Sequence, residues 1–192
     1  MGLNLVYLCE HHGLSEVARY WESVVTMNQY QKERFVQRMI RAMFNPLAGN
    51  RIAIFGFAFK ANTGDTRESP AIQVCRELFE EHAQVCVTDP QALAGARLDL
   101  ADVADRVAFE PDPYGAARGA HAIAILTDWS EYRTLDYTRI HGRPFHGGIL
   151  FDGRTLLDAD ELHRIGFNVP PIGRPDRTRL WSDMQKTRKR QP

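Results

Sequence analysis

The feature that most constrains the fold is a regular alternation of short apolar runs and helical patterns between residues 51 and 169. The period changes from helical to strand-like at 51–57, directly after the breaker-rich segment 46–50. Such alternation predicts a parallel sheet covered by helices on both faces. We therefore expect the α/β fold class, with a doubly wound parallel sheet preceded by a short all-helical region.

Local patterns set the expected elements of this sheet. Apolar runs predict strands at 51–57, 84–88, 107–109, 122–126, 148–151 and 167–169. Ser69 and Pro70 suit a cap and a first helical position, so a helix is expected from residue 70. Further helices are expected at 113–118 and 158–165, while 91–105 is expected to be helical or irregular.

The first 46 residues carry a helical pattern. A first helix is expected to end at 11–13, since Gly13 suits a helix stop, and Ser15 is expected to cap a second helix. Apolar residues recur there at spacings of three and four as far as Phe44, with a break near Asn28. This stripe is rich in aromatic and methionine side chains, so we expect it to face another helix or subunit, with ordinary core as the equal alternative. The expected domains are 1–46, 47–173 and a polar tail, 174–192.

Charge and cysteine usage exclude several classes of function. Twenty-four basic and twenty-four acidic residues balance, so no overall field favours nucleic acid or an anionic membrane surface. We see no signal peptide and no apolar run of membrane-spanning length. Cys9, Cys75 and Cys86 are odd in number and lie in apolar patterns, which favours reduced thiols and a cytoplasmic location. The histidines lack companions at ligand spacing, so no metal site is expected.

Two cations follow strands, where ligands of a doubly wound sheet bind. Lys60 lies in the glycine- and hydroxyl-containing loop 56–69, and Arg154 follows the fifth expected strand. Their convergence suggests a diphosphate ligand, although a solvated surface position or a helix cap is the alternative for each. Gly56 stands alone, without a full G-x-G-x-x-G, so the loop is not by itself an NAD site even though Asp89 ends the second strand.

The stretch Gly56-Phe-Ala-Phe-Lys60, followed by Thr-Gly-Asp-Thr-Arg-Glu-Ser at 63–69, resembles the signature of UDP-glucose 6-dehydrogenases. The resemblance extends to 3–10, 27–31, 89–90, 120–122, 127–129, 135–137 and 151–154. It implies a three-part enzyme that converts UDP-glucose and two NAD to UDP-glucuronate and two NADH. Its parts are an NAD-binding Rossmann domain, a helical dimerisation region, in which this chain would begin, and a Rossmann-like UDP-sugar-binding domain.

The same resemblance implies roles for individual residues. Phe59, Lys60 and Arg154 would contact the UDP-sugar, and Arg67 would reach the NAD pyrophosphate. The family's catalytic cysteine lies in a Gly-Gly-Ser-Cys-Phe stretch that should precede residue 3 and does not occur in this sequence. The lysine and aspartate that follow that cysteine in the family are also missing, since residues 1–2 stand in their place.

None of the three cysteines looks like a substitute nucleophile, because helix interiors and strands disfavour a thiolate. No catalytic residue is therefore assigned, and the chain alone is expected to be inactive. It could be a fragment of a full enzyme, half of a split enzyme completed by an NAD-domain partner, or a UDP-sugar-binding module without catalysis. A helix-mediated interaction protein without a ligand is a further alternative. Dehydrogenases of UDP-N-acetyl sugars and GDP-mannose share the architecture, but residues 63–69 favour glucose.

Overall fold

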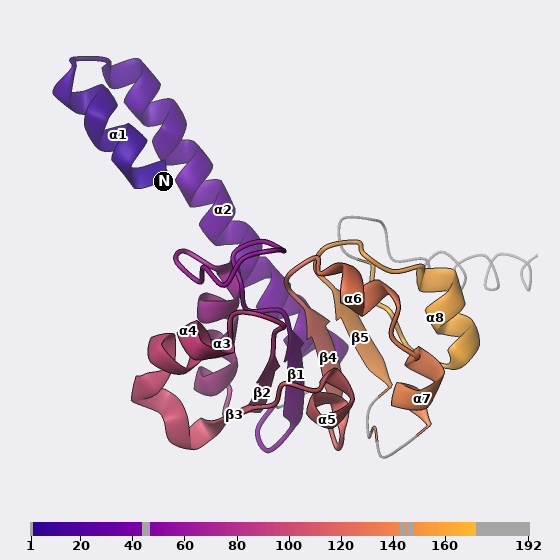
Figure 1. Cartoon of the computed structure of the whole chain (residues 1–192). Helices are drawn as coiled ribbons and strands as arrows, with labels where there is room; N and C mark the ends of the chain where they lie inside the picture. The colour runs from indigo at the N-terminus through magenta and orange to yellow at the C-terminus, as the bar shows by residue number, and fades with distance from the viewer. Residues whose placement is uncertain (1, 44–46, 143–144, 146–147, 172–192) are drawn as a thin grey trace, which may run out of the picture.

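A computed structural model of the chain describes residues 2–43, 47–142, 145 and 148–171. Within them, five parallel strands form one sheet in the order β3-β2-β1-β4-β5 (Figure 1). The strands are β1 (Arg51–Phe55), β2 (Gln84–Thr88), β3 (Val107–Phe109), β4 (Ala122–Ile125) and β5 (Ile149–Asp152). The predicted α/β, doubly wound sheet is confirmed, with these strands at their expected positions.

Helices cover both faces of the sheet (Figure 1). The elements are α1 (Gly2–His11), α2 (Ser15–Ala42), α3 (Pro70–Glu80), α4 (Leu93–Asp99), the 3-10 helix η1 (Ala101–Arg106), α5 (Pro113–Ala117), α6 (Ser130–Arg133), α7 (Tyr137–His141) and α8 (Ala159–Ile165). Alternate strand residues enter opposite cores: Ile52 and Ile54 pack with the end of α2, with α3 and with α4, whereas Ala53 and Phe55 pack with α5 to α8. Burial on both faces explains why the strands read as continuous apolar runs.

The capping pattern of α3 is the one expected. The Ser69 hydroxyl accepts a hydrogen bond from the Ala71 N–H at 3.2 Å, and Pro70 occupies the first helical position. The expected cap of α2 is wrong, because Leu14 holds the cap position and makes no side-chain cap bond. The chain reverses at Gly13, whose φ is 70°, and enters the helix so directly that Ser15 is already its first residue.

The helix α2 stays continuous through Asn28, so the break in its apolar pattern does not interrupt the backbone. Its first half pairs with α1 and projects from the sheet, and its last turns enter the main core through Val36 and Met39 (Figure 1). No helix in the described ranges is long and apolar enough to cross a membrane.

The expected last strand, 167–169, is wrong: the segment makes a single parallel bridge between Asn168 and Ile149. The N–H of Asn168 donates to the Gly148 carbonyl, but Pro170 and Pro171 follow and have no N–H with which to extend a ladder. Phe44 and the predicted tail, 174–192, lie outside the described residues. The domain limits at 46 and 173 stay predictions.

Candidate functional site

Two loops meet tightly at the carboxyl edge of the sheet, between β1 and β4. After β1 the chain continues towards β2, and after β4 towards β5, so the winding reverses here. Gly56 has a φ of 94°, and a Cβ on it would lie 2.4 Å from the Cβ of Thr127. The Thr127 hydroxyl donates to the Ala58 carbonyl oxygen at 2.7 Å. Because ligands of doubly wound sheets bind at such a reversal, this contact forms the floor of the candidate site.

A buried carboxylate ties three loops together beside this floor. Asp89, at the end of β2, is 3% exposed. Its Oδ2 accepts from the Phe57 and Ala58 N–H groups at 2.7 and 3.0 Å and from the Trp129 indole N–H at 3.0 Å. Its Oδ1 accepts from the N–H groups of residues 91 and 92 at 2.8 and 2.7 Å. Five donors therefore satisfy one carboxylate, as burial of a charge requires.

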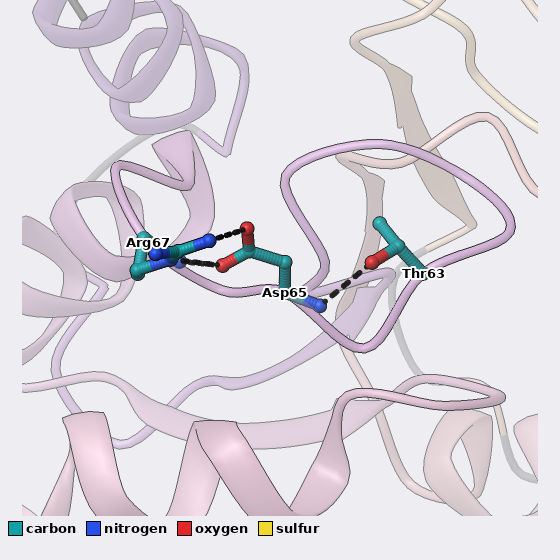
Figure 2. Close-up of polar contacts among 3 residues, drawn as sticks. All are labelled: Thr63, Asp65 and Arg67. Carbon is teal, nitrogen blue, oxygen red and sulfur yellow. Dashed lines mark hydrogen bonds and ion pairs between the residues drawn. The ribbon is translucent and has the colours of Figure 1, made fainter.

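The loop 56–69 presents two of the predicted ligand contacts to solvent. Phe59 is 48% exposed, unusual for a large apolar side chain in this part of the molecule, and Lys60 beside it is also exposed. The Phe59 N–H donates to the Asp65 carbonyl oxygen at 2.8 Å, and the Asp65 N–H donates to the Thr63 hydroxyl at 3.1 Å. These two bonds close the loop on itself, and the second, between Asp65 and Thr63, is drawn in Figure 2.

The backbone of the same loop is held in costly conformations. Asn62 and Glu68 have φ values of 62° and 59°, in the left-handed region that side chains other than glycine rarely adopt. Each such residue costs on the order of 1 kcal/mol or more and persists only where surrounding contacts enforce it. Strain of this kind is concentrated at ligand-binding segments, which fits the expected role of this loop.

Arg67 is held by a carboxylate within its own loop. Its Nε and Nη2 donate to the two oxygens of Asp65 at 2.9 and 2.7 Å, a bidentate pair (Figure 2). This hydrogen-bonded guanidinium, together with the Arg67 backbone N–H, lowers the pKa of Asp65 to about 2. The Arg67 side chain is 87% exposed, so the pair fixes its direction without burying it. One edge of the guanidinium remains directed away from the carboxylate and is free to take an anion.

Arg154 is positioned from two neighbouring strand ends. The Asp152 carboxylate accepts from the N–H groups of Arg154 and Leu157 at 3.0 and 2.8 Å, which shapes the turn after β5. The Arg154 Nη2 then donates to Asp128, in the loop after β4, at 3.2 Å. Since this single bond uses a small part of the guanidinium, most of its donors stay available.

The structure brings Lys60 and Arg154 to one edge of the sheet, as predicted, on loops that follow β1 and β5 with β4 between them. Arg67 lies at the far end of its loop, next to the start of α3. Lys60 has no ion pair among the residues that the structure describes. An exposed aromatic ring next to a lysine suits a phosphate-bearing ligand with a planar or sugar ring.

The cysteines do not suit nucleophilic chemistry. Cys75 and Cys86 are buried in α3 and β2, and burial raises the pKa of Cys75 to about 12 and also raises that of Cys86. Cys9 is half-buried on α1, outside the loops of the candidate site. Within the described ranges, no group of three or more histidine, cysteine or acidic side chains could hold a metal ion.

Sequence reasoning missed the residues that support the site. The position of Asp89 at the end of a predicted strand is visible in the sequence, but its role as the common acceptor for three loops is not. A tryptophan close after a predicted buried strand is a weak signal, because a tryptophan N–H that becomes buried needs an acceptor. Nothing in the sequence indicated which acceptor that would be.

The chain is similar to known dehydrogenases. A family model described as the UDP-binding domain of the UDP-glucose/GDP-mannose dehydrogenase family matches residues 53–159. UDP-glucose 6-dehydrogenase 2 of Oryza sativa subsp. japonica is 48% identical over 191 residues, which cover 90% of this chain and 40% of the rice protein. The Caenorhabditis elegans UDP-glucose 6-dehydrogenase is 49% identical over 178 residues, which cover 89% of this chain and 37% of the worm protein.

Solved structures agree with these relatives. The UDP-glucose dehydrogenase of the archaeon Pyrobaculum islandicum superposes with a TM-score of 0.65 and 27% identity, over 87% of this chain and 36% of the archaeal one. The chain thus spans about 40% of the length of the curated relatives it matches. The matched range includes the whole sheet except Arg51 and Ile52, together with the loop 56–69 and Arg154. The chain therefore belongs to the UDP-glucose/GDP-mannose dehydrogenase family, and residues 53–159 match the UDP-binding domain of that family.

Proposed function

We propose that this chain provides the UDP-sugar site of a UDP-glucose 6-dehydrogenase, with Phe59, Lys60 and Arg154 as ligand contacts. The reaction proposed for the whole protein is oxidation of UDP-glucose to UDP-glucuronate by two molecules of NAD. The relatives that are 48% and 49% identical to this chain over the aligned region are UDP-glucose 6-dehydrogenases, which supports glucose as the sugar. A UDP-sugar-binding module without catalysis is the alternative.

The observation that carries this proposal is the placement of two cations around the point where the sheet reverses its winding. Lys60 and Arg154 stand on loops anchored to that point by Thr127 and Asp152 respectively. A diphosphate carries charge for both, and the guanidinium can grip it with two parallel bonds. Phe59 adds an exposed ring beside Lys60, against which a uracil or sugar ring can pack.

The sheet does not fit NAD in the usual Rossmann position. There, a carboxylate at the end of the second strand binds the ribose, and a glycine-rich turn admits the pyrophosphate. Here Asp89 is buried and already accepts from five protein donors, and Thr127 fills the space above Gly56. We propose one cofactor contact from this chain, the exposed Arg67, with the rest of the NAD site in another domain.

Calorimetric titration of UDP and UDP-glucose into the chain tests the site. We expect binding by the wild type and a loss of about 1–3 kcal/mol for Lys60→Ala and for Arg154→Lys, since lysine keeps the charge but loses the planar fork. Arg118→Ala is the matched control, because Arg118 is exposed but precedes β4 and so lies at the opposite edge of the sheet. Equal affinities in all four proteins would show that neither Lys60 nor Arg154 contacts the ligand.

We also infer that copies of the chain associate through the helical region. Apolar side chains are exposed along it, from α1 to the middle of α2: Tyr7, Leu8, Leu14, Val17, Tyr20, Met27 and Tyr30. A stripe of this size on a soluble chain marks an interaction surface. Light scattering across a concentration series should show a dimer or larger species, and a monomer at every concentration would contradict the inference.

The three free thiols support a reducing compartment, which we propose to be the cytoplasm.

A further inference from the structure

The loop that carries Lys60 and the loop that holds Arg154 both form a hydrogen bond with one buried side chain, Asp89. Ala58, whose N–H donates to Asp89, is followed directly by Phe59 and Lys60. Trp129, whose indole also donates to Asp89, directly follows Asp128, the partner of Arg154. Asp89 therefore bonds to a residue two positions before Lys60 and to the residue directly after Asp128, the partner of Arg154. It belongs to a third strand, β2.

We propose that Asp89 is a positioning residue. Its carboxylate sets the distance between Lys60, on the loop after β1, and Arg154, which is held by the loop after β4. It contacts no ligand itself, because both of its oxygens are occupied and 3% of its surface is exposed. The role rests on the function proposed above for the two cations. It differs from the role that a carboxylate at this place has in a dinucleotide-binding sheet, where it points to the ribose.

A carboxylate is the side chain that fits this position. Three N–H groups converge on Oδ2 and two on Oδ1, and a carboxylate offers about four lone-pair directions and no donor. An asparagine has the same shape, but its NH2 group would face two or three N–H donors whichever way it turned. Asp89→Asn therefore breaks the arrangement on at least one side with almost no change in volume.

The test is Asp89→Asn, with UDP affinity measured by calorimetry and loop geometry by NMR. Trp129 is one of three tryptophans, so its indole N–H resonance is assigned by its disappearance in Trp129→Phe. We expect Asp89→Asn to weaken UDP binding at least tenfold and to shift the Trp129 indole and the Phe57 and Ala58 amide resonances. Trp129→Phe removes one of the five hydrogen bonds to Asp89 and should weaken UDP binding by a smaller factor.

A control separates positioning from general stability. Leu78→Ala opens a cavity in α3, on the core that faces away from Trp129, and should leave UDP affinity within twofold of the wild type while lowering the unfolding midpoint. If Leu78→Ala loses as much affinity as Asp89→Asn, the role of Asp89 is merely structural. If Asp89→Asn does not fold, Trp129→Phe decides, because unchanged UDP affinity in that variant overturns the proposal.

The outcomes also distinguish this inference from the proposed function. Wild-type binding that survives Asp89→Asn but falls with Lys60→Ala and Arg154→Lys overturns the positioning role alone. No UDP binding by the wild type, or binding that is indifferent to both cations, overturns the proposed site and the positioning role together.

Discussion

The α/β body and the projecting helical hairpin, defined as residues 2–30, use apolar residues in opposite ways. In the body, β1, β2 and β4 are buried along almost their whole length, and two continuous cores fill the space between the sheet and its helices. In the hairpin, Ala18 is the one buried residue among the side chains described. Seven of the nine large apolar side chains exposed in the described part of the chain lie there, which leaves two, Phe59 and Leu98, for the body.

This difference shows that periodicity reports an apolar face but not what covers it. The stripe of α2 has the same spacing as the apolar face of α3, yet α3 is covered by the sheet and by the last turns of α2 itself. The body is therefore complete within this chain, whereas the hairpin needs a second surface. Matched substitutions in the two regions can break or sharpen the contrast.

A first matched pair compares two glycines with positive φ. Gly56→Ala places a Cβ 2.4 Å from that of Thr127, at a φ of 94°, so overpacking and left-handed strain combine to about 3 kcal/mol or more. Gly13→Ala in the hairpin, at a φ of 70° with nothing within 4 Å, should cost only the strain, about 1–2 kcal/mol. Urea unfolding of both variants measures this, and equal losses would show that Thr127 moves aside easily.

A second matched pair compares leucines in helices. Leu78→Ala removes a side chain with no exposed surface from α3 and should cost about 2–5 kcal/mol. Leu8→Ala in α1 removes a side chain that is 49% exposed, so the free energy of unfolding of the monomer should change by less than about 0.5 kcal/mol. Leu8→Ala should instead weaken self-association in light scattering. A large stability loss for Leu8→Ala at low protein concentration would mean that the hairpin has a core of its own.

The body could be predicted well from sequence because its signals are local and agree. Turn residues separate the apolar runs, and Ser69 with Pro70 marks the start of α3 unambiguously. The failures lie where a neighbour decides. Ser15 has the right chemistry for a cap, but the reversal at Gly13 places it inside the helix, and 167–169 has strand composition but is followed by two prolines. The short helices α6 and α7 lacked a periodic face long enough to be recognised.

The candidate site was predictable in position but not in its connections. That Lys60 and Arg154 follow strands is visible in the sequence, and the parallel topology then places them at one edge. Which carboxylate holds which donor depends on contacts 26 to 40 residues apart, such as Arg154 to Asp128 and Trp129 to Asp89. The spacing of charges along a sequence does not indicate which groups form such pairs.

Caps offer a smaller contrast. Ser69→Ala removes the acceptor for the Ala71 N–H at a buried helix start, so we expect a loss of about 1 kcal/mol. Ser15→Ala should be close to neutral, because α2 has no side-chain cap bond to lose. Thermal and urea unfolding of the two variants should therefore rank them clearly. A costly Ser15→Ala would point to a contact of that hydroxyl with a second copy of the chain, which a dilution series can detect.

The smallest expected effect concerns exposed ion pairs, where body and hairpin become alike. The Arg67 side chain and both members of the Arg19–Glu16 pair are largely in solvent, and such exposed pairs contribute little to folding. The Asp65 pair still leaves a measurable mark, since the pKa of Asp65 is lowered from 3.8 to about 2 by the side chain and then the backbone N–H of Arg67. A depressed carboxyl pKa stabilises the fold above the unfolded value, near 4, and this contribution disappears as the pH falls through about 2.

Carbon-13 NMR of the Asp65 carboxyl against pH should give that low midpoint in the wild type. In Arg67→Gln the midpoint should rise most of the way to its ordinary value, because the backbone N–H remains. A wild-type midpoint near 4 would mean that Arg67 is not held by Asp65 in solution, and its direction towards a pyrophosphate would then have to come from the ligand.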